Sequence, residues 1–177
     1  MNTANLLHLP SNGNQALPPD HHLAYVAYAP VPPLTELEKE YSGRTSVSPV
    51  FDGRSWKKHE SCQSIVEPPR ERAFWLAVPP NETLRDSEKI IAWAAEQRTK
   101  FAPKGYRPAT HQELVEFARK YPELQGQFWI VALGSFTFLN DRRVVAVLDT
   151  DRGKRVLGGD WCDYKWYAKY RFLLVRN

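Results

Sequence analysis

The residues of this 177-residue sequence best suited to chemistry or binding gather between Leu157 and Tyr170. In this segment Tyr164, Trp166 and Tyr167 stand beside lysines, and the pattern has neither a helical nor a strand period. Tyr and Trp offer rigid contact area with a polar group, the composition of binding surfaces such as paratopes. We favour a binding surface here over the alternative, an aromatic core loop with solvated lysines.

Candidate nucleophiles are few. The two cysteines, Cys62 and Cys162, stand far apart, and a lone cysteine is more often a small apolar filler than a nucleophile. Their number also argues against a disulfide framework, with a single bridge between them as the alternative. We expect no catalytic residue, and therefore a protein that is not an enzyme.

The histidines do not predict a metal site. His21, His22, His59 and His111 match no zinc spacing, and no cysteine or acidic residue completes a set of ligands. His111 falls in the first turn of a predicted helix, where we expect it to face water. We predict no metal and no cofactor.

Composition bounds the class of protein. Apolar residues make up 42% and charged residues 25%, which is a globular balance. The net charge of +4 is mild, and residues 142–177 carry nine Lys and Arg interleaved with four Asp, so nucleic-acid binding is not favoured. No apolar run approaches the ~18 residues that span a bilayer. The sequence begins without a secretory signal, so we expect cytoplasmic synthesis, with display on a virus particle or cell surface left open.

Eleven of the fourteen prolines lie in residues 1–80, where we predict extended, turn-rich structure. We predict a flexible tail at 1–20, an extended Pro-rich N-terminal region at 21–70 that packs on the main domain, and the main, ligand-binding domain at 71–177. Inside the N-terminal region we predict a strand at 22–31, a short helix at 35–41 and Trp56 as an anchor.

Residues 71–177 carry clearer signals. Capping boxes begin two helices. Thr83 and Asp86 form the box of a helix over about 84–98, and Thr110 and Glu113 form the box of the second helix. Leu114, Phe117 and Ala118 form the buried face of the second helix. The remaining pattern predicts strands at 72–78, 128–133, 136–139, 144–148 and 171–175, with turns at 134–135, 140–141 and 151–153. Two helices packed on short antiparallel strands make an α+β fold, in which the last strand pairs with the first.

Three short motifs then resemble the formylglycine-generating-enzyme-like branch of the C-type lectin fold. They are the stretch Gly105–Thr110, which lacks the leucine of the family motif, the strand Trp129–Ser135 and the closing strand Tyr170–Arg176. The resemblance covers residues 74–177 and implies a C-type-lectin-like fold.

The same motifs, with the spacing of Trp161 and Trp166, resemble the variable proteins of diversity-generating retroelements, most like archaeal and archaeal-virus members. That family keeps a scaffold and varies chosen surface positions to bind ligands. The resemblance implies buried scaffold anchors at Trp161 and Trp166. It implies varied, ligand-binding positions at Phe138, Val144, Ala146, Asp149, Asp151, Arg152, Val156, Gly158, Asp160, Cys162, Tyr164, Tyr167 and Lys169. Of these, we expect Gly158, Asp160, Cys162, Tyr164 and Tyr167 to share one exposed face.

The ligand would be a protein or other macromolecule that the sequence does not name. The main alternative is a formylglycine-generating-type oxidase or its inactive relative, although that chemistry needs a pair of cysteines and Cys162 stands alone in the matching region. Trp161-Cys162-Asp163 also resembles the calcium motif of sugar-binding C-type lectins, but a thiol is a poor calcium ligand. A basic domain associated with nucleic acid is the third reading.

Overall fold

The computed structural model describes residues 23–26, 34–40, 51, 55–63, 71–79, 86–98 and 102–177. The predicted flexible tail at 1–20, residues 27–31 of the first predicted strand and Thr83 of the first capping box lie outside these ranges.

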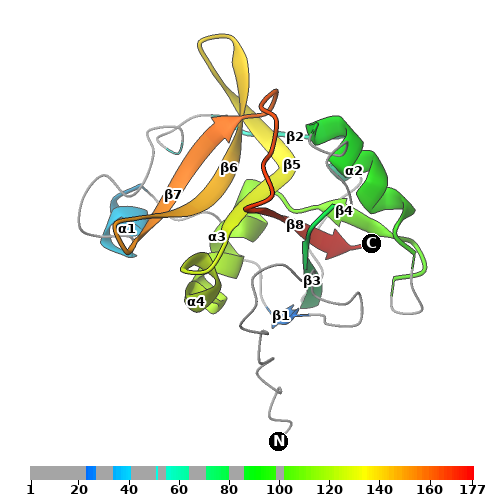
Figure 1. Cartoon of the computed structure of the whole chain (residues 1–177), viewed down its shortest axis with the longest axis horizontal. Helices are drawn as coiled ribbons and strands as arrows, with labels where there is room; N and C mark the ends of the chain where they lie inside the picture. The colour runs from blue at the N-terminus through cyan, green and yellow to red at the C-terminus, as the bar shows by residue number, and fades with distance from the viewer. Residues whose placement is uncertain are drawn as a thin grey trace, which may run out of the picture.

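One mixed sheet organises the described residues. Its strands run in the order β1-β3-β8-β5-β6-β7, with β2 paired to β5 and β4 paired to β8. The strands are β1 (Leu23–Val26), β2 (Lys57–Lys58), β3 (Glu71–Ala77), β4 (Tyr106–Pro108), β5 (Trp129–Leu139), β6 (Arg142–Asp151), β7 (Lys154–Trp161) and β8 (Tyr170–Arg176). In Figure 1 the long hairpin of β5 and β6 projects from one end of the molecule.

The helices are α1 (Leu34–Glu40), α2 (Ser87–Glu96), α3 (His111–Lys120) and α4 (Pro122–Gln125), and a 3-10 turn, η2, spans Glu60–Cys62. The predicted α+β class is therefore confirmed. The expected pairing of the last strand with the first strand of the main domain is also present, because β3 and β8 are antiparallel neighbours. The central strands β5 and β8 are parallel, so the expectation that all strands are antiparallel is wrong for this pair.

Helices α2 and α3 cover opposite faces of this sheet. On β3, the ring of Phe74 packs against Phe117 of α3, while the next ring, Trp75, packs against Trp93 of α2. Successive side chains of a strand point to opposite faces, so the two helices lie on different sides.

The predicted capping box of α3 is confirmed. The hydroxyl of Thr110 accepts from the backbone N–H of Glu113 at 3.4 Å, and the Glu113 carboxylate accepts from the Thr110 N–H at 2.8 Å. The same carboxylate receives two bonds of 2.8 Å from the buried guanidinium of Arg107. Leu114, Phe117 and Ala118 are buried as expected. Helix α2 begins later than predicted, at Ser87, with Asp86 as its N-cap.

The predicted turn at residues 134–135 is wrong. β5 continues through it, with an irregularity between Ala132 and Phe136. Gly134 lies between two other segments of the protein. Its N–H donates to the Ala109 carbonyl at 2.8 Å, and its carbonyl accepts from the His59 N–H at 3.0 Å. A Cβ on Gly134 would stand 2.6 Å from the Pro108 carbonyl oxygen, so close approach explains this glycine.

The two other predicted turns are confirmed. Asn140 and Asp141 have φ of 49° and 60°, and Arg152 and Gly153 have φ of 48° and 79°. Two successive residues with positive φ form the hairpin turn that suits the twist of paired strands. These turns join β5 to β6 and β6 to β7.

Candidate functional site

The segment from Cys162 to Lys169, here called the 162–169 loop, is fastened at both ends. Cys162 N–H donates to the Arg143 carbonyl at 2.9 Å, and Tyr170 N–H donates to the Tyr167 carbonyl at 3.0 Å. The guanidinium of Arg171 donates to the Ala168 carbonyl at 2.8 Å. These bonds fix the path of the loop across the start of β8.

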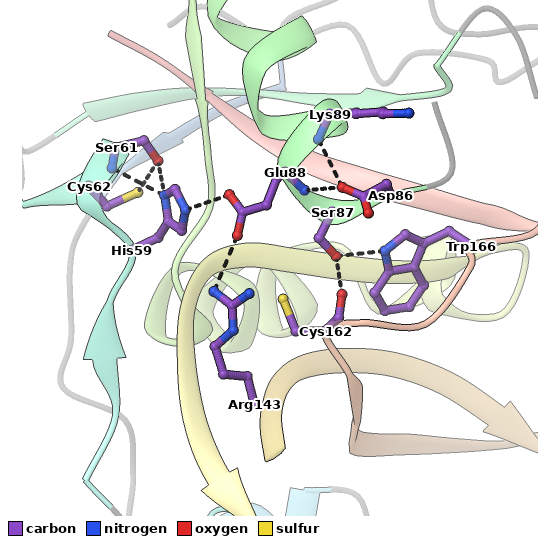
Figure 2. Close-up of polar contacts among 10 residues, drawn as sticks. All are labelled: His59, Ser61, Cys62, Asp86, Ser87, Glu88, Lys89, Arg143, Cys162 and Trp166. Carbon is purple, nitrogen blue, oxygen red and sulfur yellow. Dashed lines mark hydrogen bonds and ion pairs between the residues drawn. The ribbon is translucent and has the colours of Figure 1, made fainter. Parts of the chain in front are cut away.

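Trp166 anchors the middle of the loop. Its side chain is only 2% exposed and meets the rings of Tyr170 and Phe172 edge-on. Its indole N–H donates to the Ser87 hydroxyl at 2.9 Å, and that hydroxyl donates to the Cys162 carbonyl at 2.6 Å (Figure 2). The burial expected of this anchor is confirmed.

Two tyrosines of the loop stand in solvent. Tyr164 is 42% exposed and Tyr167 is 51% exposed, with their ring centroids 6.2 Å apart. Lys169, also exposed, places its Nζ 2.9 Å from the centroid of the Trp129 ring. The loop therefore presents aromatic side chains from a fixed backbone.

Four predicted positions share the sheet face beside this loop. The register places Asp149 opposite Val156, Val147 opposite Gly158 and Val145 opposite Asp160. Directly opposed residues of antiparallel strands project to the same side, so Asp149, Val156, Gly158 and Asp160 lie on one face. All four are half-buried.

Tyr170 joins this face to the loop. Its hydroxyl donates to the Asp160 carboxylate at 3.3 Å. Desolvation, followed by the nearby Asp160 carboxylate, raises the pKa of Tyr170, so the hydroxyl keeps its proton. Desolvation also raises the pKa of Asp149.

Three predicted surface positions are buried, and the expectation of exposure is wrong for them. Val144 and Ala146 lie inside β6, where both faces of the strand are covered. Cys162 is 7% exposed, and burial raises the pKa of its thiol. None of the three can present its side chain to a ligand without rearrangement.

Trp161 also departs from expectation. It is half-buried instead of substantially buried, and the Arg142 guanidinium lies 4.2 Å from its ring centroid. Arg142 in turn holds Asp163 at 2.8 Å. Since Trp161 is paired with Val144, it projects to the face opposite Asp160.

The remaining predicted positions are exposed but lie apart. Asp151 ends β6, and Arg152 lies in the turn that joins β6 to β7. Phe138 faces Arg143 at the other end of β6, with Lys57 Nζ 5.4 Å from its ring centroid. The predicted positions thus do not form a single patch.

His111 does not face water as expected. Its ring is stacked on Trp56 with centroids 4.3 Å apart, and its Nδ1 lies 2.9 Å from the Ser135 hydroxyl oxygen. Burial lowers the pKa of His111 to about 3. The anchoring role predicted for Trp56 agrees with this contact.

A polar cluster escaped the sequence analysis. His59, at the start of η2, contacts Ser61 with one ring nitrogen and Glu88 of α2 with the other, and Glu88 also pairs with Arg143 of β6 (Figure 2). No motif could reveal this cluster, because 29 residues separate His59 from Glu88 and 55 separate Glu88 from Arg143.

Cys62 borders the cluster but is itself buried. Its thiol donates to the Pro108 carbonyl at 3.4 Å, and burial raises its pKa above the ordinary value. Both cysteines are free thiols. Among the described residues no group of three or more His, Cys, Asp and Glu could hold a metal ion.

No helix in the described part of the chain is long and apolar enough to cross a membrane. Comparison of this sequence and structure with protein-family models, with curated proteins and with solved structures found no match.

Proposed function

We propose that this protein binds a macromolecular ligand through the 162–169 loop and the adjoining face of β6 and β7. The observation that carries this proposal is the exposure of Tyr164 and Tyr167 on a loop whose backbone is fixed from beneath. Rigid exposed aromatics supply contact area at low entropic cost, which is the chemistry of binding hot spots.

We further propose that the fold is C-type-lectin-like and that the chain is a variable protein of a diversity-generating retroelement. The motifs behind that resemblance act as scaffold here. Gly105 has φ of 80°, and a Cβ on it would lie 2.5 Å from the Ala95 carbonyl oxygen. Arg107 and Thr110 both bind Glu113, which fixes the start of α3. Motif residues with structural roles are what a conserved scaffold beneath a varied surface requires.

The closing motif supports the same division of roles. Arg171 bonds the Ala168 and Tyr170 carbonyls at 2.8 and 3.1 Å and lies over the Phe128 ring. It therefore holds the end of the loop, while the side chains that project from the loop are free to differ. Variation at Tyr164 and Tyr167 would change the binding surface without removing a core contact.

The test is the DNA around the gene. We expect a reverse transcriptase gene and a near-copy of the 3′ end of this gene, with differences concentrated in the codons of Tyr164, Tyr167, Asp160 and Lys169. The codons of Trp166 and Arg171 should be identical in the two copies. Absence of the near-copy, or differences spread evenly over scaffold and surface codons, would overturn the retroelement assignment.

Ligand binding itself has a separate test. Libraries randomised at the exposed positions Tyr164, Tyr167 and Lys169 are displayed and selected against a panel of purified proteins. We expect specific binders to appear while the folded fraction stays near that of the parent. A matched library randomised at Val144, Ala146 and Cys162, which are buried, should lose folding instead. Equal loss of folding in both libraries would contradict the proposed surface.

A further inference from the structure

Two serine–histidine pairs with similar hydrogen-bond distances occur among the described residues, and they differ in the exposure of the serine and in the surroundings of the histidine. In the first, the Ser61 hydroxyl oxygen lies 2.8 Å from His59 Nδ1. In the second, the Ser135 hydroxyl oxygen lies 2.9 Å from His111 Nδ1. A serine becomes a nucleophile when a histidine in hydrogen-bond contact can take its proton and a third group orients that histidine.

The first pair has a defined direction of proton transfer. The backbone N–H of Ser61 donates to His59 Nδ1 at 3.2 Å, so this ring nitrogen is an acceptor. A neutral imidazole then carries its proton on Nε2, which lies 3.1 Å from the Glu88 carboxylate. The Ser61 hydroxyl therefore donates to Nδ1, and Nε2–H donates to Glu88. The sequence serine, histidine, carboxylate is that of serine hydrolase triads, but the two ring nitrogens are exchanged, because in those triads Nε2 takes the serine proton and Nδ1–H donates to the carboxylate.

Glu88 is itself oriented. The Arg143 guanidinium binds its other carboxylate oxygen at 3.2 Å, so Glu88 bridges His59 and Arg143 (Figure 2). Its backbone N–H is held by the N-cap carboxylate of Asp86 at 3.0 Å. Ser61 is exposed, whereas the ring of His59 is mostly covered, so a substrate can reach the hydroxyl while the base stays in place.

The second pair lacks these features. Ser135 is 1% exposed, and its hydroxyl oxygen already accepts the backbone N–H of His111 at 2.8 Å. Burial beneath Trp56 lowers the pKa of His111 to about 3, which makes it a poor base near neutral pH. This pair serves as an internal control.

We propose that Ser61 is an acyl-accepting nucleophile, with His59 as its base and Glu88 and Arg143 as positioning residues, in a site that hydrolyses carboxylic esters. This inference does not rest on the ligand-binding surface proposed above. An ester fits this open position better than an amide, since an alcohol leaves with less help from a proton donor than an amine does.

The reaction balances without a cofactor. The Ser61 oxygen bonds to the ester carbonyl carbon and gives its proton to His59 Nδ1. The bond to the alcohol oxygen breaks, and the departing oxygen takes the proton from Nδ1. Water then attacks the acyl-Ser61 ester and gives one proton to Nδ1, which returns it to the Ser61 oxygen as the acid leaves.

The test uses the full chain with two probes, p-nitrophenyl acetate for turnover and a fluorophosphonate for covalent labelling located by peptide mass spectrometry. We expect the label on Ser61 and turnover above the uncatalysed rate. Ser61→Ala should abolish the label at this peptide, and His59→Gln should lower kcat by about a hundredfold. Ser135→Ala, the matched control, should keep both signals at wild-type levels.

Glu88 is tested as a positioning residue. Glu88→Gln should lower kcat with KM unchanged, and Glu88→Asp, which keeps the charge, should restore part of the rate. The proposal is overturned if peptide mass spectrometry of the fluorophosphonate-treated wild-type protein finds no label on Ser61. It is also overturned if Ser61→Ala hydrolyses the ester as fast as the wild type does. The Ser61–His59 contact is then only a cap for η2. Because the label is located on the wild-type protein, this experiment tests Ser61 as a nucleophile even where a variant folds poorly.

Discussion

At the scale of single residues, Trp166 and the tyrosines on either side of it have opposite roles. Trp166 is buried against Tyr170, Phe172 and the Ser87 hydroxyl, whereas Tyr164 and Tyr167 are exposed with their ring centroids 6.2 Å apart. Replacing Tyr164 and Tyr167 together by serine should change the free energy of unfolding by under about 1 kcal/mol. Trp166→Ala should cost roughly 3–5 kcal/mol, because it opens a cavity and removes the indole N–H that donates to the Ser87 hydroxyl. Urea titrations of the three proteins give both numbers.

Comparing the stability of the tyrosine double variant with that of Trp166→Ala also tests whether the two tyrosines lie on the surface. A tyrosine double variant as unstable as Trp166→Ala would mean that these tyrosines belong to the core. The proposed binding surface would then fail together with the stability prediction.

His111 predicts a specific dependence of stability on pH. Its pKa is about 3 in the folded protein, against an ordinary value of 6.5. Well above pH 6.5 the ring is neutral in both states, so it contributes no pH dependence there. As the pH falls from 6.5 towards 3, the unfolded chain binds a proton that the folded protein refuses, and stability is lost. The slope from this group is at most about 1.4 kcal/mol per pH unit.

The measurement compares wild type with His111→Phe, which keeps a ring beneath Trp56, by urea titration between pH 8 and pH 4.5. Both proteins lose stability in acid through their carboxylates, but the variant should lose it less steeply below pH 6.5. Between pH 7 and 8 the difference between the two proteins should stay constant. Parallel curves over the whole range would show that His111 is protonated freely in the folded state.

Exposure was predictable for some residues of the candidate site and not for others, for a physical reason. Tyr164, Tyr167 and Lys169 lie in a loop, and a large side chain with a polar end that projects from a loop usually reaches solvent. Val144 and Ala146 lie in a strand whose residues 144–148 are all buried, because the sheet is covered on both faces. Alternation along such a strand does not distinguish an exposed face from a core face. His59 and Glu88 meet only through the tertiary fold.

At the scale of elements, local signals located the helices better than the strands. The box of Thr110 and Glu113 marks the first turn of α3 because its hydrogen bonds close within four residues. β7 escaped prediction, since Gly158 and Gly159 interrupt its apolar pattern and its strand form depends on pairing with β6. Gly134 resembled a turn residue in sequence, although its role is close contact with Pro108 and Ala109.

Substitutions of two glycines by alanine distinguish the loss of stability caused by close contact from the loss caused by backbone conformation. Gly134→Ala places a Cβ 2.6 Å from the Pro108 carbonyl oxygen and 2.7 Å from that of Ala109, so β5 and the segment that leads from β4 to α3 must move apart. We expect a loss of roughly 3 kcal/mol, at the upper end of overpacking effects. Gly153→Ala meets no atom within 4 Å, but its φ of +79° disfavours a Cβ, and we expect a loss of roughly 1–2 kcal/mol.

Urea titration measures both glycine variants, and far-UV circular dichroism checks that each retains its secondary structure. If Gly134→Ala were the milder of the two, the turn predicted at residues 134–135 would describe this segment better than a continuous β5 does.

At the scale of the whole molecule, the N-terminal region belongs to the same folding unit as residues 71–177. β1 pairs with β3, and β2 pairs with β5, so segments before residue 71 supply strands of the shared sheet. Leu37 is fully buried in the common core. Trp56 covers His111, and His59 reaches Glu88. Composition separated the two regions because proline shapes the first, yet packing unites them.

This arrangement makes a prediction for the isolated C-terminal region. A fragment of residues 71–177 loses β1 and β2, the partners of β3 and β5, together with the Trp56 ring over His111 and the Leu37 side chain. The removal exposes apolar surface that nothing in the fragment can bury, so we expect no cooperative urea transition and increased binding of a hydrophobic dye. The full chain should unfold in one transition that fluorescence and circular dichroism report at the same urea concentration.

Trp56→Ala in the full chain is the matched control, because it removes the ring that is stacked on His111 and keeps β1 and β2. Trp56 is half-buried, so the loss should be roughly 2–3 kcal/mol, below the 3–5 typical of a fully buried tryptophan. The variant should still unfold cooperatively. A fragment that unfolds cooperatively at the midpoint of the full chain would instead make the N-terminal region an accessory. Residues 71–177 would then fold as a self-contained domain.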